Sequence, residues 1–280
     1  FALRIPYVPI LYSKEGLTLP YDFSLVFPSS PPLLLSILSS VLTPPSVWIA
    51  YLLFAALLAS LLCFTLGIAT RTSACIASLL YFYYIELSFH QGMTSYIRLF
   101  FFLLLLFTFS DAGKTFSYEM WRKHGSIFAW EPGSVLVQRL IALQITATYL
   151  GVGWQKSWLP DWQGGEVLYY SFQSMWATPV AWWFVRERFP MWVYDGMVIL
   201  VTYFEAALPF GLWIRKLRPW FMFGGVLFHL GISLFLAAIW WFYAMIAAYI
   251  TFFEPEEVYE RLQVLGVRYQ VVLKAEPRQC

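Results

Sequence analysis

Long apolar stretches alternate with short polar segments along most of this chain. Several stretches approach or exceed the roughly 20 apolar residues that a helix needs to cross a bilayer. These stretches are Val47 to Ala69, Ser73 to Phe89, Tyr96 to Ser110, Val135 to Gly153, Trp192 to Ile214 and Pro219 to Phe253. The last one has about twice the length of a single span, so we expect it to break near Ala237 to Trp240. The pattern predicts about seven transmembrane segments.

Helices are the expected form of these segments, because backbone groups in hydrocarbon must be satisfied within the segment itself. The short alternating segments of a membrane β-barrel are not seen. The predicted fold is therefore all-α, a polytopic transmembrane bundle of about seven spans with short interfacial helices. Pro32 to Thr43 is expected to form one interfacial helix, and Glu166 to Val185 one or two helices interrupted at Thr178-Pro179.

The same pattern divides the chain into three parts. Residues 1–46 form an extracytoplasmic or interfacial segment with a short helix, residues 47–253 the transmembrane bundle, and residues 254–280 a short tail. Phe1 stands where a complete chain would have Met, and Phe1 to Pro20 lacks the run of apolar residues that a span needs. We therefore expect a further segment upstream, and whether it spans the membrane is open.

Lys and Arg, which are enriched in cytoplasmic loops, predict the orientation. One side of the seven-span bundle would hold 11 of the 18 basic residues, namely Arg71, Lys114, Arg122, Lys123, Arg215, Lys216, Arg218, Arg261, Arg268, Lys274 and Arg278. The other side would hold Arg4, Lys14, Lys156, Arg186 and Arg188. The C-terminus is therefore predicted to be cytoplasmic and the Lys156 segment extracytoplasmic.

Composition supports the membrane assignment and removes other classes of function. The chain is 60% hydrophobic and 12% charged, whereas soluble domains carry about 25% charged residues. Lipid is therefore the expected partner of much of the surface. The net charge is +2, without a long basic run, which excludes a nucleic-acid partner. Cys63, Cys75 and Cys280 lack metal-ligand spacing, so no metal site is predicted.

Charged or titratable residues inside spans are costly and need either an internal partner or a function. Glu205 lies in the middle of a predicted span, with Pro209 one turn later. Its role is either architectural or functional. His229 lies deep in an uncharged run and is either a satisfied core histidine or a proton-handling residue facing a cavity.

Lys156 is the most informative single position. Trp154, Trp158 and Trp162 frame it, so its ammonium group is expected to be partly desolvated. Desolvation favours the neutral amine, which can act as a general base. The alternative is that Lys156 anchors the helix at the membrane interface. The residues alone identify no cofactor.

The stretch from Gln138 to Tyr170 resembles the HTTM (horizontally transferred transmembrane) domain family, whose best-known member is the vitamin K-dependent gamma-carboxylase. The matching pattern is a Gln-bearing helix followed by Tyr149, Gly151 or Gly153, Lys156, Trp162 with Gly165, and Tyr169-Tyr170. Three further segments follow the expected order. These are His90 through Arg98 to Asp111, Glu205 with Pro209-Phe210, and His229 leading to Phe242 through Met245 and Phe252-Phe253. The likeness covers roughly residues 47 to 257.

The resemblance implies that Lys156 is the weak base that deprotonates a hydroquinone. In the carboxylase, oxygen then converts the quinol anion to a strong base that removes a γ-proton from a peptidyl glutamate, to which carbon dioxide adds. His90 matches only loosely a histidine that precedes the third helix of the family. A quinone or hydroquinone is the implied cofactor. The candidate residues for binding it are Tyr149, Trp154, Trp158 and Trp162, and His229 and Glu205 are further catalytic candidates.

Three functions follow from these observations. The carboxylase carries a large lumenal domain after its membrane part, whereas this sequence continues for 27 residues after Phe253. The sequence therefore favours an accessory or structural subunit of a larger membrane assembly, with other membrane subunits as partners. The alternative is a quinol-dependent carboxylase-like enzyme with Lys156 as base. A weaker alternative is a proton-coupled transporter that uses Asp195, Glu205 and His229.

Overall fold

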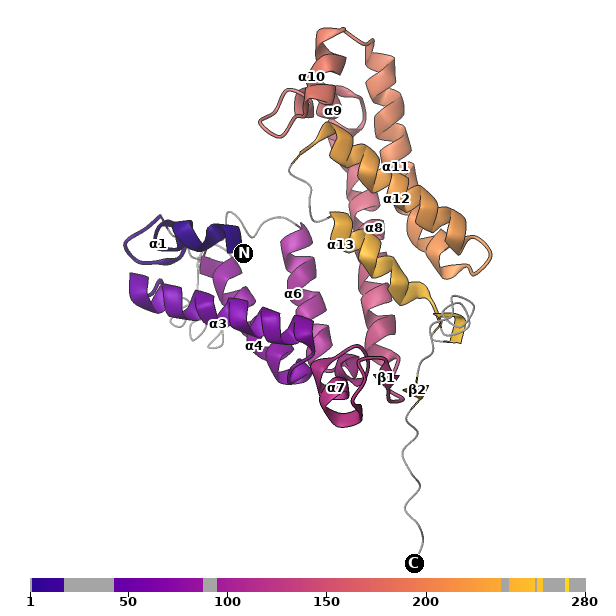
Figure 1. Ribbon diagram of the computed structural model, residues 1–280. Helices are drawn as coiled ribbons and strands as arrows, with labels where there is room; N and C mark the ends of the chain where they lie inside the picture. The colour runs from indigo at the N-terminus through magenta and orange to yellow at the C-terminus, as the bar shows by residue number, and fades with distance from the viewer. Residues whose placement is uncertain are drawn as a thin grey trace, which may run out of the picture. The chain divides into compact units, whose positions relative to one another are not determined.

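The computed structural model describes residues 2–17, 43–87, 95–237, 242–254, 256–258 and 270–271. The described chain is mostly helical (Figure 1), as the all-α prediction requires. One short parallel strand pair was not predicted, and it joins β1 (Ala129–Trp130) to β2 (Gln270–Val271). The chain forms two compact units: the first comprises Phe1–Val137 with Leu262–Cys280, and the second comprises Gln138–Arg261.

The first unit is built on three long helices, each packed against its neighbour in sequence. They are α3 (Val47–Leu66), α4 (Thr70–Leu87) and α6 (Ser95–Thr108). Shorter elements complete the unit: η1 (Ala2–Tyr7), α1 (Val8–Tyr12), η3 (Ala112–Lys114) and α7 (Tyr118–His124). Helix α3 ends at Gly67, which adopts a left-handed φ of 70° that glycine tolerates without steric cost.

Aromatic rings hold the first unit together. The ring centroid of Tyr84 on α4 lies 4.6 Å from that of Tyr12 and 5.4 Å from that of Phe54, both edge to face. The buried Tyr84 hydroxyl donates to the carbonyl of Ala50 at 2.8 Å. This core therefore combines apolar burial with a satisfied polar tip, as buried tyrosines normally do.

The second unit contains the longest helices. Its elements are α8 (Leu136–Trp158), η4 (Pro160–Trp162), α9 (Glu166–Ser171), α10 (Pro179–Arg186), α11 (Met191–Trp213), α12 (Arg218–Phe235), α13 (Phe242–Ala248) and η5 (Tyr249–Phe252). Helices α11 and α12 form a hairpin, visible in Figure 1, and α13 packs against α12. The predicted interruption at Thr178-Pro179 separates α9 from α10. Thr178 caps α10 by accepting from the backbone N–H of Ala181, and Pro179 occupies the first turn.

A helix covers at least part of each predicted span, but the number of spans is not confirmed. Two helices, α3 and α11, are long and apolar enough to cross a membrane by length and composition. Helix α12 ends at Phe235, short of the break expected near Ala237 to Trp240, and residues 238–241 are outside the described part. The interfacial helix expected at Pro32 to Thr43 also lies, except for Thr43, outside the described residues.

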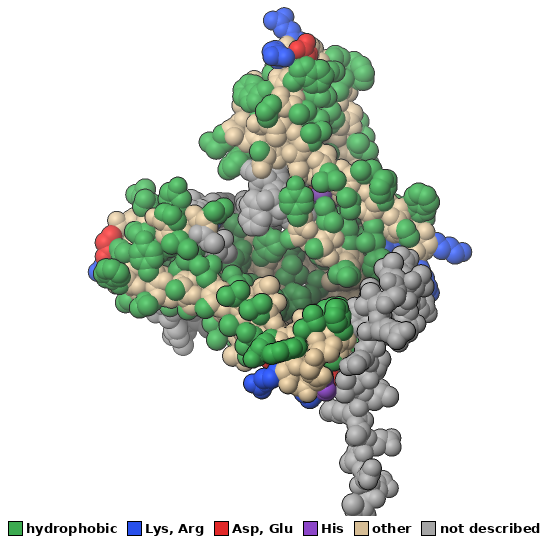
Figure 2. Space-filling model, viewed as in Figure 1, with side chains coloured by type: hydrophobic (Ala, Val, Ile, Leu, Met, Phe, Trp, Pro, Cys, Tyr) green, Lys and Arg blue, Asp and Glu red, His purple; other side chains and the backbone are tan. Residues whose placement is uncertain are grey.

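Large apolar side chains lie on the outer surfaces of both units, as Figure 2 shows for one face. On α3 they include Trp48, Leu52 and Leu62, and on α11 they include Leu200 and Tyr203. Apolar surface on this scale is rare in soluble monomers and indicates a lipid or protein environment. Together with the two spanning-length helices, it indicates a membrane protein.

Candidate functional site

Lys156 and Glu205 form a buried ion pair between α8 and α11. The Lys156 Nζ lies 2.5 Å from the Glu205 Oε2, and the two side chains are only 13% and 10% exposed. The same ammonium group lies 4.3 Å from the ring centroid of Trp162. The sequence placed both charged residues among its candidates but gave no sign that they meet. Each of the two charged residues therefore has an internal partner, as a charge inside an apolar helix requires.

Small residues bring the two helices close enough for this pair to form. A Cβ atom on Gly153 would lie 3.2 Å from the Cβ of Ala206, tighter than an ordinary van der Waals contact. The close approach places the last turn of α8 against the middle of α11, where Lys156 and Glu205 meet. Glycine at such a position allows close backbone approach, which is common between membrane helices.

The segment after α8 is tied to α11 through Gly165 and Asp195. The Asp195 Oδ1 accepts the backbone N–H of Gly165 at 2.6 Å. A Cβ atom on Gly165 would overlap the Cβ of Tyr194 and the backbone nitrogen of Asp195, so only glycine fits there. Three residues earlier, Trp162 is thereby held near Lys156. The Trp-x-x-Gly spacing noticed in the sequence thus positions an aromatic ring beside the ion pair.

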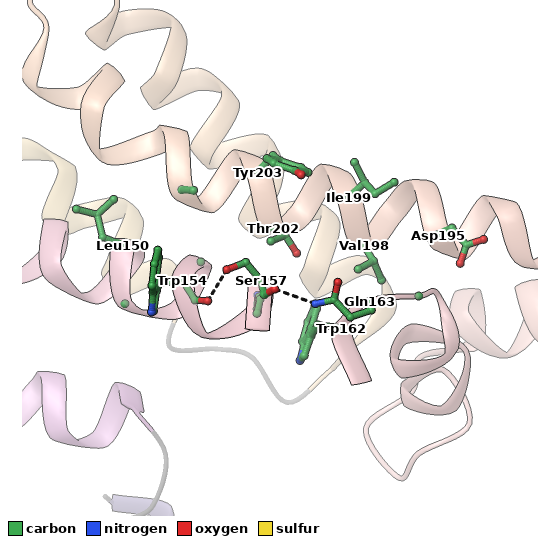
Figure 3. A pocket seen from close by; sticks show the side chains of 15 residues that line it. Leu150, Trp154, Ser157, Trp162, Gln163, Asp195, Val198, Ile199, Thr202 and Tyr203 are labelled. Atoms are coloured by element: carbon green, nitrogen blue, oxygen red, sulfur yellow. Dashed lines mark hydrogen bonds between the residues drawn. The ribbon is translucent and has the colours of Figure 1, made fainter. Parts of the chain in front are cut away.

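A cavity of about 680 Å³ opens beside the pair, within the size range of small-molecule sites. Lys156, Trp154 and Ser157 line it from α8, Trp162 from the following segment, and Thr202 and Tyr203 from α11. Figure 3 shows Trp154, Ser157 and Trp162 on one side of this space and Thr202 on the side of α11 that faces them. Most of the lining is apolar or aromatic, and the polar groups are few, as in typical ligand sites.

A second buried polar cluster lies in the same unit. The Tyr149 hydroxyl lies 2.6 Å from the His229 Nε2 and 3.0 Å from the Tyr249 hydroxyl, and the Tyr249 hydroxyl lies 3.1 Å from the same imidazole nitrogen. All three residues are buried. The sequence singled out Tyr149 and His229 but missed Tyr249, because a tyrosine in an apolar run is more often a packing residue. The two groups that contact the Tyr249 hydroxyl lie on α8 and α12, which are distant from Tyr249 in sequence.

The structure thus divides the predicted candidates into groups. Lys156, Glu205 and Trp162 meet at one point, and Trp154 lines the cavity beside them. Trp158 is 70% exposed and packs against Trp154, with ring centroids 5.7 Å apart. Tyr149 and His229 belong to the second cluster described above. His90 lies outside the described residues.

The residues of the transporter hypothesis bind separate partners. Asp195 accepts from Gly165, Glu205 pairs with Lys156, and His229 contacts two tyrosines. They do not form one continuous hydrogen-bonded chain among the described residues. In the part of the chain that the structure describes, no group of three or more His, Cys, Asp or Glu side chains is arranged to hold a metal ion.

Comparison with known proteins gives one match. The family model of the HTTM domain matches residues 33–256, which include every residue of the cavity and of the tyrosine–histidine cluster. No curated protein and no solved structure matches the chain. The matched range therefore includes both residues of the ion pair.

Proposed function

The chain belongs to the HTTM domain family, and from this premise we propose that it is a membrane enzyme whose α8–α11 cavity binds a hydroquinone and removes a proton from it. The observation that carries the proposal is the Lys156–Glu205 pair at the wall of an aromatic cavity. The sequence alone put an accessory role first. A buried acid–base pair beside a space of ligand size is what leads us to put the enzyme first.

The chemistry of the lining fits a planar aromatic alcohol. Trp154, Trp162 and Tyr203 offer ring faces and edges to an aromatic ligand. Lys156 supplies N–H donors and Glu205 supplies carboxylate oxygens at the same place. A bound hydroquinone would supply an electron-rich anion that reacts with oxygen, which is the chemistry that the resemblance to the carboxylase implies.

The pair, rather than Lys156 alone, is the proposed base. Paired with a carboxylate, Lys156 is an ammonium group and has no lone pair with which to accept a proton. When its proton passes to the Glu205 Oε2 at 2.5 Å, Lys156 becomes a neutral amine that can take the proton of a ligand hydroxyl. The ligand O–H bond is then broken, Lys156 again carries the positive charge, and Glu205 holds the extra proton. This differs from the expectation that desolvation alone would make Lys156 neutral.

We also propose the membrane arrangement expected from the sequence. The bundle comprises residues 47–253 in about seven spans, residues 1–46 lie at the extracytoplasmic face, and residues 254–280 form the cytoplasmic tail. Single cysteines introduced at Ser157 and at Lys216 should react with a membrane-impermeant maleimide from opposite sides of sealed cells or inverted vesicles. Labelling of both from the same side would reject this topology.

The enzyme proposal is tested by replacing Lys156. In detergent-purified protein, Lys156→Ala should lower the ionised fraction of bound 1,4-dihydroxynaphthalene, measured anaerobically by its absorption spectrum, and should slow quinol oxidation on addition of oxygen by about 100-fold or more. Lys216→Ala, which changes an exposed lysine in the turn between α11 and α12, is the matched control and should leave both unchanged. An unchanged rate in folded Lys156→Ala would reject the proposal.

An accessory subunit remains the second candidate function. Large tryptophans are exposed on the second unit, among them Trp182, Trp192 and Trp220, and such side chains are enriched where proteins contact one another. Purification in mild detergent separates the two candidates. A partner that co-purifies in fixed stoichiometry, without quinol turnover, would favour the accessory role. A monomer that binds and oxidises hydroquinone would favour the enzyme.

A further inference from the structure

One threonine hydroxyl on a helix that borders the cavity has no hydrogen-bond partner among the described residues. The Oγ1 of Thr202 on α11 is buried and makes no hydrogen bond to any of them, and Thr202 is one of the residues that line the cavity. In Figure 3, Thr202 lies on the side of α11 that faces Ser157 and Trp162. A buried polar atom without a partner costs free energy, so such an atom at the wall of a cavity calls for an explanation.

Three half-buried threonines in the described helices do not behave in this way, although the buried hydroxyl of Thr70 at the start of α4 also has no partner among the described residues. The hydroxyls of Thr146 and Thr148 on α8 donate to the carbonyls of Ala142 and Gln144, at 2.8 and 2.9 Å. Thr108 on α6 donates to its own helix in the same manner. This local bond to the carbonyl four residues earlier is the usual way in which a helical threonine satisfies its hydroxyl. Thr202 makes no such bond to the carbonyl of Val198, so its hydroxyl is left without a partner among the described residues.

Thr202 also lies near Glu205 on α11. It precedes Glu205 by three residues, which is about 4.5 Å along the helix axis. Residues three apart share a helix face, so both can face the same side of the cavity.

We propose that the Thr202 hydroxyl binds the second oxygen of a ring with two para oxygens, whose first oxygen is deprotonated by the Lys156–Glu205 pair. This rests on the proposed function and adds to it the residue by which the site would select rings with two opposed oxygens over rings with one. Thr202 is a specificity-determining residue, and it takes no part in the proton transfer. Its hydroxyl can donate to, or accept from, the ligand oxygen.

The experiment measures binding of two probes under anaerobic conditions. They are 1,4-dihydroxynaphthalene, with two opposed hydroxyls, and 1-naphthol, with one. Dissociation constants are obtained from quenching of tryptophan fluorescence, for the wild type, Thr202→Val and Thr148→Val. Valine has the shape of threonine without the hydroxyl. Thr148→Val is the matched control, because its hydroxyl is bonded within α8.

We expect Thr202→Val to bind 1,4-dihydroxynaphthalene about tenfold more weakly than the wild type, the size of one hydrogen bond. Its affinity for 1-naphthol should be unchanged, and Thr148→Val should behave as the wild type with both probes. Equal affinities of Thr202→Val and the wild type for the diol, with binding still dependent on Lys156, would overturn the inference and leave the proposed function standing. If the wild type binds neither probe, the proposed function itself fails.

Discussion

Two buried ion pairs in the second unit have nearly the same geometry but different surroundings. The Arg218 Nη1 lies 2.5 Å from the Glu257 Oε2, as the Lys156 Nζ lies 2.5 Å from the Glu205 Oε2. Arg218 also donates from Nε to the carbonyl of Leu212 at 2.9 Å. Glu257 also pairs with Arg215, at 2.6 Å, and none of these residues lines the cavity beside Lys156.

The difference suggests what each pair does. Arg218 is held at the start of α12 by two acceptors, the Leu212 carbonyl and the Glu257 carboxylate, and arginine does not deprotonate in proteins, so its pair does not exchange a proton. Among the described residues, Lys156 has Glu205 as its hydrogen-bond acceptor, and the rest of its ammonium group faces Trp162 and the cavity. We infer that the Arg218 pair stabilises the fold and that the Lys156 pair is available for chemistry.

The largest expected effect is on proton transfer. Glu205→Gln keeps the shape of the side chain but removes the carboxylate that would hold the extra proton. We expect the ionised fraction of bound 1,4-dihydroxynaphthalene, followed by absorption, to fall together with quinol oxidation by about 100-fold or more. Glu257→Gln is the control, and it should leave the ionised fraction as it is in the wild type. Equal losses in both variants would erase the distinction between the two pairs.

The next effect is on stability. Arg218→Ala leaves Glu257 without its buried partner, because the Arg218 side chain is only 6% exposed. Removing one partner of a buried pair costs about 3–5 kcal/mol of the free energy of unfolding. Arg215→Ala removes the other partner of Glu257, but its side chain is 76% exposed, so about 1 kcal/mol or less is expected. Denaturation in detergent micelles measures both, and a larger loss for Arg215→Ala would contradict this assignment.

A smaller effect concerns the pH dependence of the Arg218 pair. Burial raises the pKa of Glu257, but the backbone N–H of Glu254 and the guanidinium groups of Arg218 and Arg215 outweigh it, so the pKa lies below its ordinary value of 4.5. A carboxyl group with a lower pKa in the folded state stabilises the fold above its unfolded pKa and loses that contribution as the pH falls through the folded value.

The difference in unfolding temperature between the wild type and Glu257→Gln should therefore be constant well above pH 4.5 and shrink as the pH falls below it. Thermal unfolding at a series of pH values measures this difference. A difference that grew on acidification would show that the sign is wrong.

The smallest expected effect concerns the aromatic ring beside Lys156. Trp162→Leu removes the ring that faces the ammonium group, and a loss of about 1 kcal/mol in the free energy of unfolding is expected from the lost cation–π contact. Trp158→Leu changes a ring that is 70% exposed and should cost less than about 0.5 kcal/mol. Equal effects of the two substitutions, measured by denaturation, would mean that the contact with Lys156 contributes nothing.

Local features of the sequence were enough to predict the helices. Apolar run length indicates where a helix can lie in a membrane, and Thr178 before Pro179 marks the start of α10, because capping and proline geometry act within a few residues. Features that depend on residues distant in sequence were not predicted, because such local signals do not report on them. The β1–β2 pair joins residues some 140 positions apart, and its two-residue strands have no alternating pattern long enough to detect.

By itself, the sequence determined the membrane character, the family and the candidate residues Lys156, Glu205, Tyr149 and His229, because composition and order in the chain need no knowledge of contacts. The tertiary structure decided which of them meet. Lys156 pairs with Glu205 across 49 positions, and Tyr149 reaches His229 across 80. It also left the Thr202 hydroxyl without a hydrogen-bond partner among the described residues, while the Thr148 hydroxyl bonds to its own helix. The pairing of Lys156 with Glu205 depends on how closely α8 and α11 approach at Gly153, and helix periodicity carries no information about that approach.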